Sequence, residues 1–434
     1  GNILLDRVTV TPLPNSKRMI SVTADATHFV NCFGKIEMRY CLFENQIDDP
    51  SNIHGIYAKI IRQPKEDEII VQLVHPQQFG FDLVKSGEHL ELVHGPSLMT
   101  YGAAQVKSVE YFNKEFIRIQ FTQTLPNDLK PGDAVAALGN YPELYIQHCI
   151  MRGNRARGFL LNNRGKTVVE YNYFHVPGSA ILFEGDARFW FEQAGVRDCV
   201  IRNNVFDNCN YGVWGEATIE VAAGIDEEYR DKSRYNRNIV IENNLFRVFD
   251  RHPIVKAYSI EGLIIRNNTI EYTDAYPSRN LDGKPFVITD SDNVSISDNV
   301  SIEKSTIKPL SDNPRVRAVM TERQPLADLG NGYYQNPILA GNYADVSVVR
   351  VGPEYYMVHY CGHWRGMLAW HSRDLVNWRP YTRIDVPIVG SVWAPELIYH
   401  EGLFYLYLPM MSPGNGHVWV MTSNSLKGPW SKPV

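Results

Sequence analysis

The stretch VIRNNVF at residues 200–206 decides the fold, because the chain repeats its pattern several times. The related runs are IEMRYCLF (36–43), YIQHCIM (145–151), VVEYNYF (168–174), VIENNLF (240–246), IIRNNTI (264–270) and VSISDNV (294–300). Apolar and polar residues alternate in each run with the period of a β-strand, and an Asn or Cys precedes the last apolar residues. The repeat predicts a series of similar strands separated by turns.

The spacing of the aligned asparagines indicates how these strands are arranged. Asn172, Asn204, Asn244, Asn268 and Asn299 follow one another at steps of 32, 40, 24 and 31 residues. A unit of about 24 residues, lengthened by loops at one corner, is typical of a parallel β-helix, whose coils stack about 4.8 Å apart. Stacked Asn side chains can hydrogen-bond from coil to coil. We therefore predict an all-β protein built on a right-handed parallel β-helix. A β-sandwich is the alternative, but it explains only the Asn-rich turns.

Two regions lack the repeat. Residues 57–140 hold alternating strands with Gly and Pro turns, which predicts an antiparallel β-barrel inserted between coils. Residues 305–335 are polar and proline-rich, as linkers are. Residues 336–434 hold aromatic strands at short intervals, the spacing of a β-propeller, which we expect to be partial. The β-helix would occupy 1–56, lacking its N-terminal part, and 141–304.

Composition and charge exclude several classes of protein. Of the 434 residues, 44% are hydrophobic and 12% aromatic, and the formal net charge is -5. These values allow several packed cores but provide no basic stripe for nucleic acid or an anionic membrane. Because no apolar run approaches the roughly 18 residues of a spanning helix, we also predict no membrane insertion. No signal peptide is visible.

The cysteines are predicted to be buried thiols rather than ligands. They are Cys32, Cys41, Cys149, Cys199, Cys209 and Cys361, and they form no CxxC pair and have no companion His spacing. The prediction is therefore that no metal is bound. A disulfide between Cys199 and Cys209 is the alternative.

Acidic residues about one coil apart are the candidate catalytic groups. Asp25 in VTADATHFVNC precedes Asp48 in FENQIDDPSNIHG by 23 residues. Equivalent positions on successive coils would bring both carboxyls, and that of Asp49, to one groove. Crowded carboxyls suit glycosidic cleavage, which needs one protonated acid and one ionised base. His28 and His54 are candidates to bind sugar hydroxyls. The competing interpretation is that both stretches are ordinary surface turns.

A second set of acids and aromatics lies on neighbouring coils. These residues are Glu184, Asp186, Trp190 and Glu192 in GSAILFEGDARFWFEQAG (178–195), and Trp214, Glu216 and Glu220 in YGVWGEATIEV (211–221). Sugar rings stack on indole while their hydroxyls bond to charged acceptors. Together these residues predict a carbohydrate groove.

With these motifs, residues 1–300 resemble glycoside hydrolase family 110, on TADATHFVNCFGKI, FENQIDDPSNIHGIY, GSAILFEGDARFWFEQAG and YGVWGEATI. The resemblance implies exo-acting, inverting hydrolysis without metal or cofactor, releasing terminal α-1,3-linked galactose from blood-group-B or linear α-galactosyl glycans. It implies that the catalytic residues are Asp25, Asp48 and Asp49, and we predict Asp25 as the acid and the other two as holding the water. Asp186, Trp190, Glu192 and Glu216 would line the galactose pocket.

Residues 336–434 resemble the start of glycoside hydrolase family 43, a five-bladed propeller, on NPILAGNYADVSVVRVGPEYYMVHY, HSRDLVNWRP, SVWAPELIYHEGLFYLYL and TSNSLKGPWSKPV. The resemblance implies that Asp345 is the general base of a second site. We expect this site to be incomplete, because the family's other catalytic carboxyls come from later blades and Glu396 does not match the acid. The sequence YADVS also lacks the proline that usually follows the aspartate.

Two other functions stay open for a β-helix. A polysaccharide lyase usually needs a basic residue for the uronate carboxylate and often a calcium cluster, whereas the predicted cleft is acid-rich. A tail-spike-like protein would bind glycans without cleaving them. The glycosidase reading implies glycan partners, a periplasmic or extracellular bacterial location, and a homodimer as one assembly to test.

Overall fold

The computed structural model describes residues 1–13, 16–278, 282–303, 326–361, 366–386, 391–412 and 415–434. The predicted fold class is confirmed, since stacked parallel sheets, a closed barrel and antiparallel propeller blades account for the strands of these ranges. Helical structure is limited there to two 3-10 turns, η1 (Pro76–Gln78) and η2 (Glu227–Tyr229). No helix in these ranges is long and apolar enough to cross a membrane. Residues 305–325, most of the predicted linker at 305–335, lie outside them.

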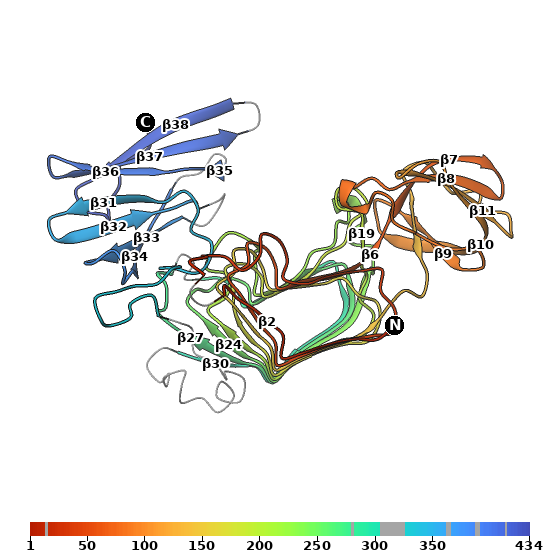
Figure 1. Ribbon diagram of the computed structural model, residues 1–434, viewed down its shortest axis with the longest axis horizontal. Helices are drawn as coiled ribbons and strands as arrows, with labels where there is room; N and C mark the ends of the chain where they lie inside the picture. The colour runs from red at the N-terminus through yellow and green to blue at the C-terminus, as the bar shows by residue number, and fades with distance from the viewer. Residues whose placement is uncertain (14–15, 279–281, 304–325, 362–365, 387–390, 413–414) are drawn as a thin grey trace.

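Three sheets run along the β-helix, and Figure 1 shows the coils stacked into one three-sided outline. The first sheet contains β1 (Ile3–Asp6), β4 (Lys35–Arg39), β13 (Glu143–Gln147), β16 (Thr167–Glu170), β20 (Cys199–Arg202), β23 (Asn236–Glu242), β26 (Ile260–Arg266) and β29 (Asp292–Ser297). The second contains β2 (Thr9–Val10), β5 (Leu42–Glu44), β14 (Ile150–Arg152), β17 (Tyr173–His175), β21 (Val205–Asp207), β24 (Leu245–Val248), β27 (Thr269–Tyr272) and β30 (Val300–Ile302).

The third sheet carries the side chains of greatest functional interest. It contains β3 (His28–Val30), β6 (Ser51–Ile56), β15 (Phe159–Leu161), β18 (Ile181–Phe183), β22 (Ile219–Val221), β25 (Val255–Tyr258) and β28 (Phe286–Thr289), all paired in parallel. A short antiparallel strand, β19 (Glu192–Gln193), pairs with the end of β6. A segment from another coil therefore lies beside the strand from which the barrel begins.

The repeated Asn-Asn pair forms the corner between the first and second sheets, and its two residues play different parts. The first asparagine has a left-handed backbone, with φ of 57° at Asn203 and 55° at Asn243. Asparagine tolerates this conformation better than most residues. The second asparagine is buried, and Asn204 and Asn244 have no exposed surface. The first Asn of each pair therefore forms the turn, and the second fills a buried position inside the coil.

The buried asparagines form the predicted ladder. The side-chain amide of Asn204 donates to the Oδ1 of Asn244 at 3.1 Å and to the backbone oxygen of Val169 at 2.9 Å. The backbone N of Asn204 donates to the same Oδ1 at 2.9 Å. The same contacts recur along the column from Asn172 to Asn299. Each rung thus ties its coil to the next.

The other column residues also agree with the sequence. Phe174, Phe206 and Phe246, which end three of the repeats, stack with ring centroids 4.9 and 4.8 Å apart. This distance is close to the spacing of paired strands, about 4.8 Å.

Cysteine takes the place of the ladder asparagine in the two earlier coils, at Cys41 and Cys149. All six cysteines are free thiols. The alternative of a Cys199–Cys209 disulfide was wrong.

The inserted barrel follows β6 directly. Its strands are β7 (Ala58–Lys65), β8 (Glu68–Gln72), β9 (His89–His94), β10 (Met99–Tyr111), β11 (Phe116–Phe121) and β12 (Ala134–Ala137), closed in the order β10-β11-β8-β7-β12-β9. Two buried contacts join the barrel to the coils. Arg164 Nη1 lies 2.7 Å from Glu91 Oε2, and the hydroxyls of Tyr57 and Tyr235 lie 2.9 Å apart. The barrel is therefore fixed beside the third sheet, as Figure 1 shows.

The C-terminal residues form two antiparallel sheets of four strands. The first contains β31 (Ser347–Val351), β32 (Glu354–Val358), β33 (Met367–Ser372) and β34 (Arg379–Ile384), and the second contains β35 (Ser391–Val392), β36 (Glu396–His400), β37 (Leu403–Ser412) and β38 (Asn415–Ser423). The first sheet packs on the β-helix through Trp370, whose ring lies 6.3 Å from that of Tyr276. Tyr276 in turn stacks on Tyr211 of the coils at 5.1 Å.

The ladder predicts that removing one of its side-chain amides lowers the free energy of unfolding substantially. In Asn204→Ala, the Asn172 backbone and side-chain N–H groups lose their acceptor, and the Val169 carbonyl loses its donor. Each buried polar group left unpaired costs about 1–3 kcal/mol, so the variant should lose at least about 2 kcal/mol of unfolding free energy. Chemical denaturation followed by circular dichroism measures this loss. The exposed Asn127→Ala is the control and should stay within about 0.5 kcal/mol. Equal midpoints for both variants would contradict the role of the ladder.

Candidate active site

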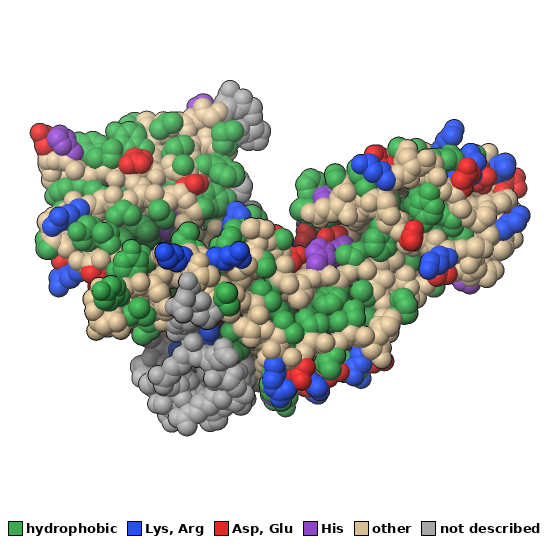
Figure 2. Space-filling view, viewed as in Figure 1, with side chains coloured by type: hydrophobic (Ala, Val, Ile, Leu, Met, Phe, Trp, Pro, Cys, Tyr) green, Lys and Arg blue, Asp and Glu red, His purple; other side chains and the backbone are tan. Residues whose placement is uncertain are grey.

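Acidic and histidine side chains gather in a hollow on one face of the molecule. Figure 2 shows them between the barrel and the C-terminal sheets. The hollow lies over the start of the third sheet, where β3 pairs with β6 in the register His28 to Asn52. The loops that precede these two strands carry the predicted catalytic aspartates.

The structure brings Asp25, Asp48 and Asp49 together. One carboxylate oxygen of each lies within 4.8 Å of the others. The backbone N of Asp49 donates to Asp25 Oδ1 at 3.1 Å, and the backbone N of Ala26 donates to the Asp49 carbonyl at 2.9 Å. The two loops therefore continue the stacking of the strands that follow them, and this stacking crowds the carboxyls.

Arg157 binds the innermost carboxyl of the three. Its Nη2 lies 3.0 Å from Asp49 Oδ2, and its backbone N donates to Asp49 Oδ1 at 2.8 Å. The Asp49 side chain is 2% exposed. Burial raises the pKa of Asp49 to about 7, and the Arg157 guanidinium opposes this rise. Burial and the nearby Asp25 also raise the pKa of Asp48 above its ordinary value.

A chain of two histidines leads away from Asp25. His28 Nδ1 lies 2.8 Å from Asp25 Oδ2, and His28 Nε2 lies 2.8 Å from His54 Nε2. His54 Nδ1 donates to the Gly55 carbonyl at 2.7 Å, so the Nε2 of neutral His54 is an acceptor. Burial lowers the pKa of His54 to about 4, whereas the hydrogen bond with Asp25 raises the pKa of His28. His28 Nδ1 thus faces a carboxylate, and its Nε2 faces the acceptor nitrogen of His54.

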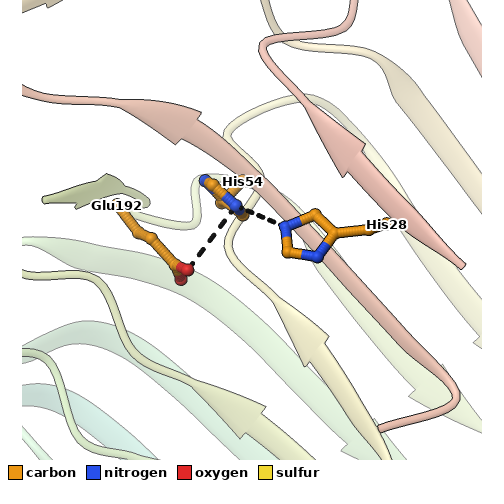
Figure 3. A group of neighbouring side chains, drawn as sticks. All are labelled: His28, His54 and Glu192. Carbon is orange, nitrogen blue, oxygen red and sulfur yellow. Dashed lines mark hydrogen bonds and ion pairs between the residues drawn. The ribbon is translucent and has the colours of Figure 1, made fainter. Parts of the chain in front are cut away.

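Glu192 closes the other side of this group. Its Oε1 lies 3.5 Å from His54 Nε2, and Figure 3 shows Glu192 and His28 pointing to the same ring. The side-chain amides of Asn52 and Asn162 donate to its two oxygens at 3.3 and 3.4 Å. Burial raises the pKa of Glu192 to about 7. A carboxyl with this pKa is partly protonated near neutral pH and can both donate and accept hydrogen bonds.

A pocket of about 280 Å³ opens beside these residues. Its lining includes His28, His54 and Glu192 from the coils, and His75 and Gln78 from the barrel insertion. It is close to the lower end of small-molecule pockets, about 300 Å³, so it fits one sugar ring better than several. The inserted barrel thus supplies one wall of the pocket.

Trp190 provides an aromatic face to the same pocket. Its side chain is 41% exposed, and its ring lies 4.9 Å from that of His75. Asp186 lies beneath it, where one carboxylate accepts from the backbone N of Arg188, Phe189 and Trp190 at 2.9, 2.7 and 3.0 Å. Asp186 was predicted to line the pocket. It instead shapes the turn that presents Trp190, because backbone N–H groups occupy its carboxylate.

The other predicted site residues are not among those that line the pocket, and neither are Asp25, Asp48 and Asp49, which reach it through His28. Glu216 pairs with Lys256, and Glu220 accepts from Ser179 Oγ at 2.9 Å. Trp214 lies under the guanidinium of Arg155, at 5.6 Å. Asp345 is exposed, with a left-handed backbone at φ 54°, in the loop before β31 of the C-terminal sheets. Glu396 is the first residue of β36 and is also exposed.

Several residues at the site were missed from the sequence. Arg157 lies in RGNRARGF, a loop whose other arginines point elsewhere, so charge alone did not distinguish it. His75 and Gln78 belong to the barrel insertion, which showed no sugar-binding pattern of its own. Asn162 follows β15 and joins the site because β15 pairs with β6. Only this last residue had a usable signal, namely its place one coil after His54.

Comparisons with known proteins agree with both resemblances. Residues 334–434 match the family model described as glycosyl hydrolases family 43, and residues 68–135 match the GLAA-B beta-barrel domain II. An α-1,3-galactosidase B from Phocaeicola vulgatus is 36% identical over 317 residues, which make up 69% of this chain and 52% of that protein. An α-1,3-galactosidase A from Shewanella woodyi is 34% identical over 292 residues, 67% of this chain and 47% of that protein.

The chain thus spans about half the length of the curated relatives it matches. Among solved structures, the GH43 BlXynB protein from Bacillus licheniformis is 33% identical over 23% of each chain, with a TM-score of 0.20. The resemblance of the larger part to glycoside hydrolase family 110, and of the C-terminal part to family 43, is confirmed.

The pairing of Arg157 with Asp49 predicts a pH-dependent loss of stability. In Arg157→Met, Asp49 keeps its burial but loses its cation. Removing one partner of a buried pair costs about 3–5 kcal/mol, and since Arg157 is partly exposed we expect at least about 2 kcal/mol. The folded-state pKa of Asp49 is about 7 with the arginine and must be higher without it. The variant's deficit should therefore grow as the pH rises above about 7, because the proton that Asp49 then retains is released on unfolding.

Denaturant unfolding at two pH values, one on each side of 7, measures this deficit. The exposed Arg155→Met, two residues away, is the matched control and should change stability little. A deficit that does not change with pH, or that equals that of the control, would contradict the pairing.

Proposed function

We propose that this chain carries an exo-acting, inverting α-galactosidase site that releases terminal α-1,3-linked galactose from glycans such as blood group B or linear α-galactosyl structures. The observation that carries the proposal is the cluster of Asp25, Asp48 and Asp49 beside a pocket that fits one sugar ring. The names of the relatives support the substrate.

The contacts of the three aspartates favour particular roles. Asp48 has no cation at ion-pair distance among the described residues, and burial raises its pKa. Because it is less buried than Asp49 and is not held by a charged partner, Asp48 is a better candidate for the general acid than Asp25, the acid predicted from the sequence. Asp25 is paired with His28, and Asp49 with Arg157. These two are the better candidates to orient and deprotonate the water.

Burial of Asp49 supports an inverting course. A retaining enzyme needs a carboxylate that reaches the anomeric carbon, whereas an inverting enzyme needs one that reaches a water. Asp49 has a 2% exposed side chain, and both oxygens of Asp25 accept hydrogen bonds, so neither is free for direct attack. The nearest carboxylate oxygens lie within 4.8 Å of one another, which is nearer the about 5–5.5 Å of retaining enzymes than the about 6.5–9.5 Å of inverting enzymes. The stereochemistry is therefore the decisive test.

The pocket supports the exo mode and the recognition of one terminal sugar. Trp190 offers an indole face for the C–H side of the ring. His54 and Glu192 offer an acceptor and a carboxyl for hydroxyls, and Gln78 fixes the Trp190 turn by donating to the Trp190 carbonyl at 3.1 Å. Because the barrel insertion walls one side of the pocket, a chain end fits it better than a chain that runs through.

A lyase fits these contacts less well. Uronate elimination needs a cation free to neutralise the sugar carboxylate, but Arg157 is already paired with Asp49 and lies 3.9 Å from Glu184. An unsaturated product that absorbs in the ultraviolet would nevertheless establish that reaction.

We propose that the chain acts on glycans outside the cytoplasm, and that it neither binds nucleic acid nor inserts into a membrane. Asp345 would be the general base of a second site in the C-terminal sheets.

Replacing any one of the three proposed catalytic aspartates should cause a large loss of rate. Asp25→Asn, Asp48→Asn and Asp49→Asn should each lower kcat at least about a hundredfold, because general acid–base catalysis contributes about 10²–10⁴. Release of galactose from Galα1-3Gal measures the rate, and thermal unfolding checks the fold. Asp128→Asn, exposed on the barrel, is the control. A variant of the three that keeps near wild-type kcat would remove its residue from the proposed site.

The stereochemical course is tested by following anomeric protons by NMR as the folded chain acts on Galα1-3Gal. An inverting site releases β-galactose first, and the α form follows only by mutarotation. If α-galactose is released first, the roles of the three aspartates are wrong. If a folded chain binds the glycan but leaves it intact, it is a glycan-binding protein rather than an enzyme.

A further inference from the structure

His28, His54 and Glu192 present three donor atoms to one point at the mouth of the pocket. We propose that they form a binding site for a divalent transition metal ion of the Zn²⁺ type, and that the bound ion blocks the pocket. Only the blocking effect depends on the proposed function, because binding of the ion requires no sugar and no catalysis. The side chains come from β3, β6 and β19, three strands of one sheet.

The donor atoms are spaced closely enough to share one ion. His28 Nε2 and His54 Nε2 lie 2.8 Å apart, and His54 Nε2 lies 3.5 Å from Glu192 Oε1. All three donor atoms lie within 4.8 Å of one another. In a tetrahedral zinc site with bonds of about 2.0–2.1 Å, neighbouring donors are about 3.3 Å apart. Shifts of up to about 1.5 Å in the donor atoms would therefore bring all three pairs to this spacing.

The remaining atoms of these side chains are held as they are in metal sites. A metal-binding histidine usually donates its second ring N–H to a carboxylate or a backbone carbonyl, which fixes the ring and its tautomer. His28 Nδ1 faces Asp25 Oδ2 at 2.8 Å, and His54 Nδ1 faces the Gly55 carbonyl at 2.7 Å. Both Nε2 atoms are thereby directed at each other and at the carboxylate.

Glu192 is supported in the same way. Asn52 donates to Oε1 at 3.3 Å and Asn162 to Oε2 at 3.4 Å, so the carboxylate is held by two amides from other strands. The set of two imidazoles and one carboxylate is one that catalytic zinc sites use, with the fourth position open to water or substrate. Here the fourth position faces the pocket that His75 and Trp190 also line.

The charges at the site also favour an ion. Coordination uses the lone pair of each Nε2 atom, and any proton held there passes to the solvent. The ion then brings two positive charges to a point near the carboxylates of Glu192 and Asp25. Since His54 and Glu192 are the groups proposed to bind sugar hydroxyls, an ion held by them competes with the sugar.

Binding is tested with Co²⁺ as a probe on the full chain after removal of metals with EDTA. A four-coordinate Co²⁺ site gives intense visible d–d absorption, and Zn²⁺ added afterwards should abolish it by displacement. His54→Gln and Glu192→Gln should each weaken Co²⁺ binding at least about tenfold, as loss of metal-site groups does. The exposed His89→Gln on the barrel is the matched control and should bind Co²⁺ like the wild type.

Because His54 is buried, its variant could fail to fold, so His28→Gln provides a second test. The His28 side chain is 37% exposed, and this variant should fold yet bind Co²⁺ at least about tenfold more weakly. Absence of the four-coordinate spectrum in the wild type, or an unchanged spectrum in folded His28→Gln and Glu192→Gln, overturns the site.

The blocking effect is measured as release of galactose from Galα1-3Gal with and without Zn²⁺. Activity that falls with Zn²⁺ and returns with EDTA supports it. Full activity at Zn²⁺ concentrations that saturate the Co²⁺ displacement overturns blocking but leaves the binding site in place. A chain that binds Co²⁺ yet releases no galactose under any condition would leave the metal site standing while the proposed galactosidase function fails.

Discussion

The hydrogen-bonded stacking of one coil on the next is the constraint on which the structure depends. In the ladder, the Oδ1 of Asn204 accepts from the backbone and side-chain N–H groups of Asn172, and the Oδ1 of Asn244 accepts in the same way from Asn204. A buried amide without these partners would cost about 1–3 kcal/mol, so the register of neighbouring coils cannot slip without breaking the ladder. Since side chains alternate between faces, this register also decides which residues point outward from the third sheet. The site inherits its geometry from the ladder.

Stacking creates the chemical character of the site as well as its position. The loops before β3 and β6 must follow their strands, so Asp25 and Asp49 approach each other regardless of their charge. Like charges at this distance disfavour joint ionisation, and each of the two has acquired a cationic or protonated neighbour, His28 or Arg157. Asp48 has none in the described residues. In the function that we propose, it is the different environments of these three identical side chains that separate the acid from the base.

The inserted barrel and the C-terminal sheets contact the β-helix in different ways. The barrel is joined through buried polar contacts, Arg164 to Glu91 and Tyr57 to Tyr235. Such contacts fix the orientation of the barrel, because a buried polar group that loses its partner is destabilising. It lends His75 and Gln78 to the pocket. The C-terminal sheets contact the coils through aromatic stacking around Tyr276 and Trp370, and none of their described residues is in the pocket lining. The part of the chain that resembles family 43 therefore lies outside this pocket.

The sequence by itself determined the β-helix and the approach of Asp25 to Asp48, because both follow from the repeat along the chain. It also indicated the barrel and the propeller strands, which lack that repeat, through short alternating runs between turns. Residues such as Asn204 and Phe206 recur at the same place in each coil, and recurrence can be read without coordinates. Only the tertiary structure decided that Arg157 binds Asp49, that Asp186 supports a turn, and that Glu192 lies beside His54. These contacts join residues that are 108 or more positions apart or depend on which way one side chain points. The repeat predicts neither the long-range contacts nor the direction of a single side chain. The loops inserted at the corners do not follow the repeat that positions the strands.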